Sequence, residues 1–245
     1  FKQASDRVEA FLSNGERAAY DVVVGADGIR SRVRQLLFGH EFEPRFTGLS
    51  AWRYTTSRRR ELTHQSMYLG VGVKAGLVPL TSDTMYLLLV SVEPDNRWIP
   101  EEQLGGLLCE RMRSFGGMVG DLRDEVARAK NIVYTPIEEV ILPLPWHKGR
   151  VILIGDAAHA SSPHIAQGAA MAIEDAVVLA DLLAGQGDVA SALLEFERRR
   201  FPRCKFVQDL SRKTGEDGNL SDPELCRRRN ENIRRTFASP QPRPH

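Results

Sequence analysis

The chain contains few cysteines, little excess charge and no long apolar run free of charges. Its three cysteines, Cys109, Cys204 and Cys226, are odd in number and far apart, which argues against a secreted disulfide framework and against a cysteine-based metal site. We therefore expect no metal. Sparse cysteine without a visible signal peptide is typical of a reducing compartment, so we expect a cytoplasmic protein.

Charge and hydropathy exclude two further classes of partner. A formal net charge of +1 over 245 residues creates no field that would gather nucleic acid. The longest stretch of small apolar residues, 166–184, contains Glu174, Asp175 and Asp181, and three acids in one span argue against a membrane helix. We expect no nucleic-acid partner and no membrane segment.

Two short apolar runs, each ending in Gly and Asp, are the most informative pattern. They are DVVVGADG at 21–28 and RVILIGDAAH at 150–159. Such runs indicate parallel strands buried on both faces, and ligands of α/β folds bind beyond the carboxyl ends of such strands. Since ionised Asp27 and Asp156 can only accept hydrogen bonds, we expect a hydroxyl-rich ligand there.

The segment between the two runs has a different sequence pattern. It contains strand patterns separated by turns and few helical patterns, which favours an antiparallel sheet. The expected strands are 49–56, 66–73, 76–80, 85–92 and 132–142, and the expected helices are 101–114 and 119–129.

The flanking segments complete an α/β chain. Strands are expected at 8–12 and 18–24, and helices at 29–37, 167–183 and 189–211, the last kinked or interrupted by Pro202. Beyond residue 215 the chain is polar, and its last eight or so residues are expected to be disordered. The predicted domains are 1–45, an inserted β-rich domain at 46–143, a return to the first domain at 144–215, and a tail at 216–245.

A helix with a small-residue start follows the second run. Gly155 would let a ligand approach the backbone, and free amides at the start of the helix would stabilise an anion or a ring carrying delocalised negative charge. Taken alone, each feature favours a structural role, either ending a strand or packing tightly. Together, in this order, they indicate a site that contains Gly155, Asp156, Pro163, Gln167, Gly168, Ala169 and Ala170.

At this point the sequence resembles a known family. DVVVGADGIRSRVR and GRVILIGDAAHASSPHIAQGAAMAIEDAVVLADLL are similar to the second and third flavin fingerprints of the class A, p-hydroxybenzoate hydroxylase-like flavoprotein monooxygenases. The resemblance implies a partial FAD-binding, Rossmann-like domain of the glutathione reductase type with an inserted β-rich substrate domain. It also implies hydroxylation of an aromatic or heteroaromatic molecule with NAD(P)H and oxygen, through a flavin C4a-hydroperoxide.

The resemblance also assigns roles to individual residues. It places Asp156 on the flavin ribitol, Pro163 beside the isoalloxazine, and the amides of 167–170 near the N1 and O2 edge of the ring. The first fingerprint, which that family uses for FAD and has been linked to NAD(P)H, implicates Asp27, Gly28, Ser31 and Arg34. The β-rich domain would cover the flavin and supply the substrate pocket. A homodimer is possible, but no feature of the sequence supports one.

The sequence departs from the family pattern in two places. Ala166 replaces a glycine before Gln-Gly, which we expect to be mild because only the amide is needed there. The chain also lacks the Gly-x-Gly-x-x-Gly turn that holds the FAD pyrophosphate in the family, and Gly70-x-Gly72 is no substitute because hairpin strands surround it. We therefore expect a carboxyl-terminal part of a longer enzyme, one that binds FAD weakly or not at all.

Several side chains are candidates for the pocket or for structural roles. Lys74 and Arg53 are the candidate catalytic residues together with Pro163, although a solvated lysine and an arginine that caps the sheet remain open as alternatives. Tyr68 is expected to pack in the sheet, and His159 to structure its loop. Glu174 and Asp175 are expected to bond locally on their helix, and Arg203 to cover the outer face of the last helix.

Two other functions remain open. A flavoprotein of the same fold could dehydrogenate or reduce without oxygenation, because the fingerprints report the cofactor and not the fate of oxygen. A non-catalytic fragment is the third alternative, since the phosphate-binding turn is missing.

Overall fold

The computed structural model describes residues 1–185 and 187–238, which fall into two compact units. The first unit contains Phe1–Thr47 and Glu138–Thr214, and the second contains Gly48–Ile137 and the residues from Gly215 onward. The chain therefore leaves the first unit, forms most of the second, and returns. The predicted boundary at 143/144 falls six residues later than this division.

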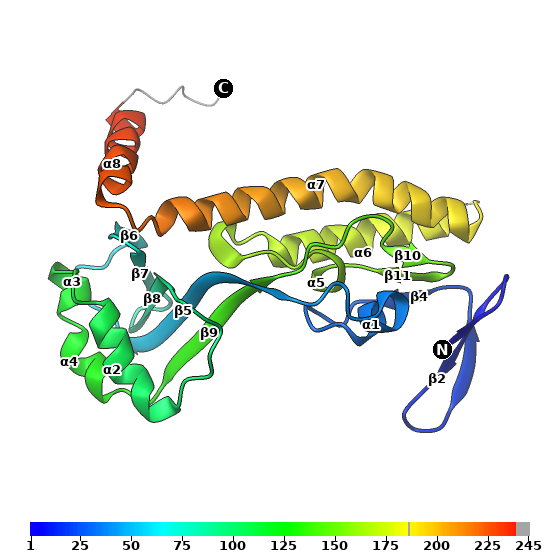
Figure 1. Ribbon diagram of the computed structural model, residues 1–245, viewed down its shortest axis with the longest axis horizontal. Helices are drawn as coiled ribbons and strands as arrows, with labels where there is room; N and C mark the ends of the chain where they lie inside the picture. The colour runs from blue at the N-terminus through cyan, green and yellow to red at the C-terminus, as the bar shows by residue number, and fades with distance from the viewer. Residues whose placement is uncertain (186, 239–245) are drawn as a thin grey trace. The chain divides into compact units, whose positions relative to one another are not determined.

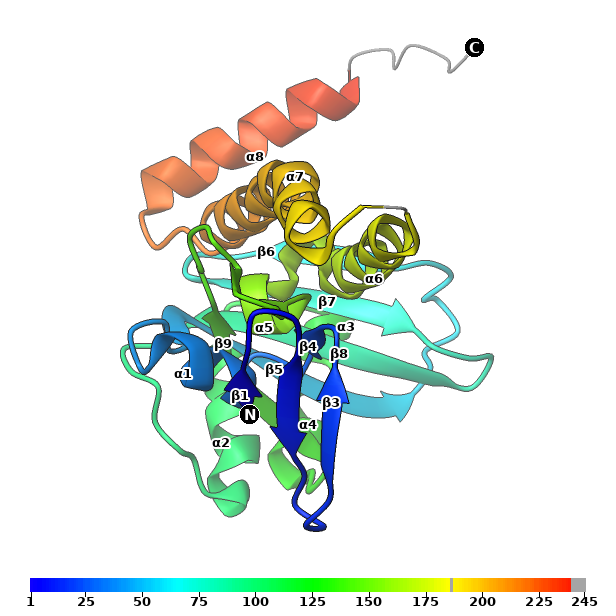
Figure 2. The same cartoon turned by 90° about the vertical axis from the view of Figure 1, so that its right-hand side faces the viewer.

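The two signature runs form adjacent parallel strands in the first unit. β4 (Val23–Gly25) pairs with β11 (Val151–Leu153), with Val151 opposite Val23 and Leu153 opposite Gly25. β10 (His147–Lys148) adds to the other edge of β11 in antiparallel orientation. The prediction of two parallel strands is confirmed, and their carboxyl ends lie at one edge of the sheet. A separate antiparallel sheet contains β1 (Lys2–Gln3), β2 (Val8–Phe11) and β3 (Arg17–Tyr20), shown in blue in Figure 2.

Helices pack against the β10–β11–β4 sheet to form the core of the first unit. They are α1 (Arg32–Phe38), α5 (Asp156–His159), the 3₁₀ turn η1 (Pro163–Ile165), α6 (Gly168–Ala184) and α7 (Val189–Gly218). α6 and α7 lie side by side (Figure 1), and Met171, Leu179 and Phe196 join the strand residues in one buried cluster. α7 runs through Pro202 without a break, so the predicted interruption is wrong. Pro202 is exposed, where water can satisfy the carbonyl that loses its donor.

The second unit is a five-stranded sheet with helices on one face. The strand order is β6 (Ser66–Leu69), β7 (Val73–Pro79), β8 (Thr84–Val92), β5 (Arg45–Ser57) and β9 (Ile132–Glu139). The pairings β6–β7, β7–β8 and β5–β8 are antiparallel, as the sequence predicts. Side chains from alternate strand positions form a core with α2 (Glu101–Arg111), α3 (Gly117–Gly120) and α4 (Arg123–Arg128).

The carboxyl-terminal part is more helical than its polar composition suggested. α7 extends to Gly218, and α8 (Pro223–Ala238) occupies most of the predicted tail. Arginine and glutamate are good helix formers, and Glu224 pairs with Arg227 and Arg228 one turn later. Residues 239–245, on which most of the predicted disorder falls, lie outside the described residues. Within the described part of the chain, no helix is both long and apolar enough to cross a membrane.

Candidate functional site

A pocket opens at the carboxyl end of β11, between the start of α5 and the start of α6. Its volume is about 380 Å³, and it is lined by Asp156, Ser161, Ser162, Pro163, Ala166, Gly168, Ala169 and Ala172. Asp156 is the first residue of α5 and is exposed. Among the described residues its carboxylate has no hydrogen-bond partner, so it is available to a ligand hydroxyl.

The start of α6 is open to the same pocket. Gln167 caps the helix without any side-chain hydrogen bond, so the first amides of α6 are not satisfied by a side-chain cap. A Cβ added at Gly168 would meet nothing closer than Ser161 Oγ at 3.8 Å. The helix mouth is therefore unobstructed, and its dipole favours negative charge at this point. Gln167 and Ala169 are exposed, and Ala170 is half-buried.

The loop between α5 and α6 is held in a fixed and unusual conformation. Pro163 is exposed at the start of η1, and Ala166, which ends this turn, has φ 55° and ψ 35°. This left-handed backbone costs an L-residue about 1–2 kcal/mol, so the replacement of glycine by Ala166 is not the mild change that we expected. From α7, Ser211 donates to the carbonyl of Ser162, and Gln208 donates to that of Ala160.

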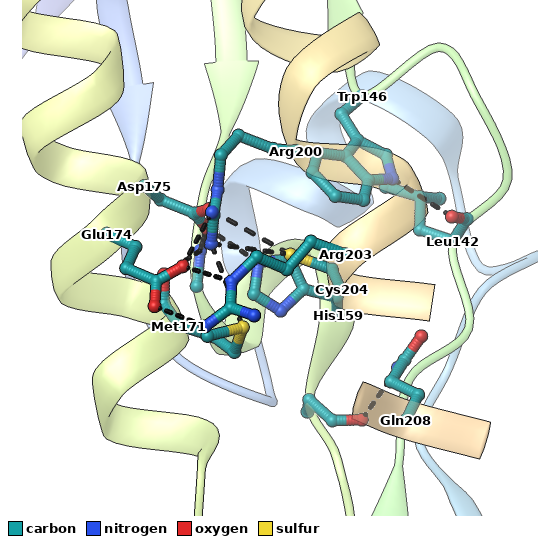
Figure 3. A network of polar contacts seen from close by, with 12 residues as sticks. Leu142, Trp146, His159, Met171, Glu174, Asp175, Arg200, Arg203, Cys204 and Gln208 are labelled. Carbon is teal, nitrogen blue, oxygen red and sulfur yellow. Dashed lines mark hydrogen bonds and ion pairs between the residues drawn. The ribbon is translucent and has the colours of Figure 1, made fainter. Parts of the chain in front are cut away.

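A buried carboxylate lies behind the Gly155–Asp156 turn. Asp175 of α6 accepts hydrogen bonds from Gly155 N at 2.8 Å, His159 Nε2 at 2.6 Å and Arg200 Nε at 2.7 Å (Figure 3). Gly155 has φ 57° and ψ −143°, and a Cβ there would lie 3.0 Å from Ala172 Cβ. Only glycine fits this close approach of strand end and helix.

The network extends across α6 and α7. Arg200 also donates to Glu174 and to the Met171 carbonyl, and Arg203 forms two hydrogen bonds with Glu174. The prediction that Glu174 and Asp175 bond locally on their helix is therefore wrong, as is the outer-face role of Arg203, because the acids face α7. The possible ligand atoms of His159, Asp175 and Cys204 lie within 4.8 Å of one another, close enough to hold a metal ion. The Asp175 carboxylate, however, is already paired with the Arg200 cation.

The pKa of His159 is raised to about 9. Burial by itself lowers it, and the hydrogen bonds to Asp175 and Cys204 outweigh that effect. The pKa of Asp175 is lowered, because hydrogen bonds from His159, Gly155 and Arg200 outweigh its burial. His159 is thus a protonated, buried partner of Asp175 at neutral pH, and the structural role expected for it agrees with this geometry.

The residues of the first fingerprint lie at the neighbouring strand end, but most of their polar atoms bond to the protein. Asp27 accepts from Ser31 Oγ and from the amides of Arg32 and Val33, which caps α1. Arg34 is 1% exposed, and its guanidinium donates to the carbonyls of residues 29 and 157. Arg34 is therefore turned into the protein. Gly28 has φ 78°, with open space where a Cβ would be.

In the second unit, Arg53 and Lys74 lie on the sheet face opposite the helices. Arg53 of β5 follows the buried Trp52, and strand register aligns it with Leu88 of β8. Arg53 is half-buried and has no partner among the described residues, so its guanidinium can bind an anion. Lys74 of β7 is 7% exposed and packs against Gly218 at the end of α7. Burial lowers the pKa of Lys74.

The last candidate from the sheet has a packing role. Tyr68 of β6 lies opposite Ala75 and packs on the helix-covered core, as the sequence predicts.

The pocket residues fit part of an FAD molecule. An unpaired carboxylate suits the hydroxyls of a ribitol chain, and the open mouth of α6 suits the electron-rich edge of an isoalloxazine ring. Gly155 and Gly168 keep the surface free of side chains where a planar ring must approach closely.

Comparisons with known proteins agree with this fit. Residues 1–211 match the family described as FAD binding domain. The chain is 34% identical over 213 residues to YetM of Bacillus subtilis, provisionally assigned as an FAD-dependent monooxygenase, and covers 58% of that protein with 86% of its own length. It is 33% identical over 225 residues to the 2-heptyl-3-hydroxy-4(1H)-quinolone synthase of Pseudomonas aeruginosa, covering 57% of that enzyme with 89% of the chain.

A solved structure extends the likeness to the fold. HpxO of Klebsiella pneumoniae, complexed with FAD and uric acid, superposes with a TM-score of 0.84 at 24% identity, over 96% of this chain and 61% of that one. Among the curated relatives named first, the chain spans less than three fifths of each protein's length. With fingerprints, pocket and fold in agreement, the chain belongs to the FAD-binding family of class A flavoprotein monooxygenases.

Proposed function

We propose that this chain forms the ribitol and ring subsites and the substrate sheet of an FAD-dependent, NAD(P)H-driven monooxygenase that hydroxylates an aromatic or heteroaromatic molecule. The observation that carries the proposal is the pocket in which the Asp156 carboxylate, which has no hydrogen-bond partner among the described residues, lies beside the open start of α6. Since the chain spans only part of its relatives, the proposal concerns a flavoprotein that contains these residues.

Bound FAD supplies the oxygen chemistry, with electrons from NAD(P)H. The chain's own residues bind and orient it. Asp156 accepts hydrogen bonds from the ribitol, and the first amides of α6, from Gly168 onward, stabilise negative charge on the ring. Pro163, which has no N–H and a stiff apolar ring, lines the pocket and helps to exclude water.

Arg53 is the residue that we assign to the substrate. Its guanidinium has no described protein partner, and its row across the sheet continues through Leu88, Gly76 and Met67. An arginine on an apolar, half-buried surface suits a flat ring that carries an acidic group. Urate in the HpxO complex is a ring of this kind, which supports the assignment.

The first experiment measures flavin binding and oxygen transfer. The flavoprotein that contains these residues is titrated with FAD by absorbance, then supplied with NAD(P)H, candidate aromatic acids and ¹⁸O₂. We expect label in the product and weaker FAD binding in D156A, while D181A, which changes an exposed acid elsewhere on α6, binds as wild type. Flavin turnover without label in any product would favour a dehydrogenase or reductase, and equal FAD affinity of D156A and wild type would reject the pocket assignment.

The second experiment tests Arg53. R53Q is expected to raise the KM for an acidic aromatic substrate about ten- to hundredfold, since a charged hydrogen bond is lost, and to leave FAD affinity unchanged. R60Q, at an exposed position of the same unit, serves as the matched control. An unchanged KM in R53Q would remove Arg53 from the substrate site.

A further inference from the structure

Asp175 is surrounded by hydrogen-bond donors from three other parts of the first unit. It is 0% exposed, and it receives the Gly155 N–H at the end of β11, the His159 imidazole from α5 and the Arg200 guanidinium from α7. Figure 3 shows the side chains of Asp175, His159 and Arg200 converging between α6 and α7. A buried carboxylate with only donors around it is strongly fixed in place, and so are the donors.

One of the three hydrogen bonds, the one from Gly155 N–H, holds the residue next to the pocket. Gly155 immediately precedes Asp156, whose carboxylate lines the pocket and has no described partner. The Gly155 backbone has φ 57° and ψ −143°, a conformation that needs support from its surroundings. The Asp175 carboxylate provides that support at 2.8 Å. Rotation of this peptide would turn Asp156 relative to α6.

We propose that Asp175 is a positioning residue for the cofactor pocket: together with His159, it holds the Gly155–Asp156 turn so that the Asp156 carboxylate is presented to the flavin. The inference rests on the proposed function, because it assumes that Asp156 binds the cofactor. The inference gives the His159–Asp175–Arg200 network a role that the shape of the pocket does not by itself reveal, which is to hold the Gly155–Asp156 turn.

The protonation of His159 gives the network a pH limit. The groups that face His159 are Asp175 from α6, Cys204 from α7 and the Trp146 ring at 5.1 Å, while Arg200 of α7 bonds to the other oxygen of the Asp175 carboxylate. The folded-state pKa of about 9 lies above the ordinary 6.5, so the stabilisation is fully present below about pH 6.5 and is lost as the pH rises through 9. Arg200 stays charged in this range and keeps its bond to Asp175. Loss of the His159 proton therefore loosens the turn without dissolving the whole network.

The test compares D175N with E174Q over pH 6–10. D175N places an amide N–H₂ among three donors, whereas E174Q changes a neighbouring member of the network that does not touch Gly155. We expect wild type to bind FAD with a constant Kd from pH 6 to 8 and about tenfold or more weaker by pH 10. D175N should bind about ten- to hundredfold more weakly at pH 7 and show no further loss near pH 9. E174Q should keep the wild-type pH profile.

H159Q provides the second arm should D175N not fold. Glutamine keeps an N–H donor toward Asp175 but does not titrate, so FAD affinity at pH 7 should be retained and the loss near pH 9 should disappear. Wild-type affinity and pH profile in D175N, or a wild-type pH profile in H159Q, would overturn the proposal.

Amide exchange separates this inference from the proposed function. In the flavin-free chain the protection factor of the Gly155 amide should fall as the pH approaches 9 in wild type and stay constant in H159Q. If the flavoprotein that contains these residues binds no FAD at any pH, the proposed function fails, and the exchange data still decide whether His159 and Asp175 hold the turn. A Gly155 amide equally protected at all pH values in both proteins would overturn the positioning role.

Discussion

Replacing Gly155 by alanine tests the geometry on which the pocket depends. The backbone at φ 57° and ψ −143° is in a region that is essentially restricted to glycine, and forcing another residue into it costs about 1–3 kcal/mol. The new Cβ would also lie 3.0 Å from Ala172 Cβ, so α6 must shift slightly and the cost rises toward the upper end. For a protein of this size, about 1–3 kcal/mol lowers the melting temperature by roughly 2–12 °C.

Calorimetry of G155A and of the matched variant G168A measures this effect. Gly168 has ordinary dihedrals, and a Cβ there meets only Ser161 Oγ at 3.8 Å, so G168A should keep or slightly raise the melting temperature. The methyl group of G168A would nevertheless lie among the atoms that line the pocket, and FAD binding should weaken. G155A with the wild-type melting temperature would refute the assigned backbone strain, and G168A with full FAD affinity would refute the open helix mouth.

Three further substitutions test neighbouring features. R34M leaves the buried Ala157 carbonyl and the half-buried Ile29 carbonyl without these donors and should lower the free energy of unfolding in urea by about 2–4 kcal/mol, while unchanged stability with poorer FAD binding would identify Arg34 as a cofactor ligand. D27A should cost about 0.5–2 kcal/mol at pH 7 through the lost cap. Burial raises the pKa of Asp27, but its three hydrogen bonds outweigh this and keep it below the ordinary value. The cost is therefore present above about pH 4 and should vanish in urea unfolding as the pH falls through the folded pKa. A166G removes the strain of the left-handed backbone but makes the unfolded chain more flexible. The free energy of unfolding should therefore stay unchanged or rise by up to about 1 kcal/mol, and a clear decrease would contradict the strain.

The parallel strands and the open helix were predictable because their signals are local. A short run such as 151–154, rich in branched apolar residues and ended by Gly-Asp, favours a strand buried on both faces, and small residues at 168–170 add no bulky side chains at the start of a helix. Their order along the chain then indicates a shared site. The antiparallel sheet was predictable for the same reason, since alternating patterns separated by turns are read within each segment.

The partners of charged side chains were not predictable, because they depend on how helices pack. Asp175 and Arg200 are 25 residues apart and meet only through the register of α6 against α7. One sequence signal for this pairing was available: Arg200 and Arg203 lie one helical turn apart on one helix, and the two adjacent acids Glu174 and Asp175 lie on the helix before it. Arg34 matched a fingerprint, but its burial against α5 is a tertiary fact that the fingerprint does not contain. α8 was missed because arginine and other polar residues dominate its sequence, although its few apolar residues recur at helical spacing.

The pairing of β4 with β11 has a consequence for synthesis. All of residues 48–137 lies between the two partners, so β4 leaves the ribosome long before the strand that completes its sheet. Until then β4 lacks this partner strand, whereas the antiparallel sheet within 48–137 can assemble from contiguous sequence. Nascent chains arrested before residue 150 should therefore be cleaved by protease in the region of β4, and those extended past α7 should resist cleavage there.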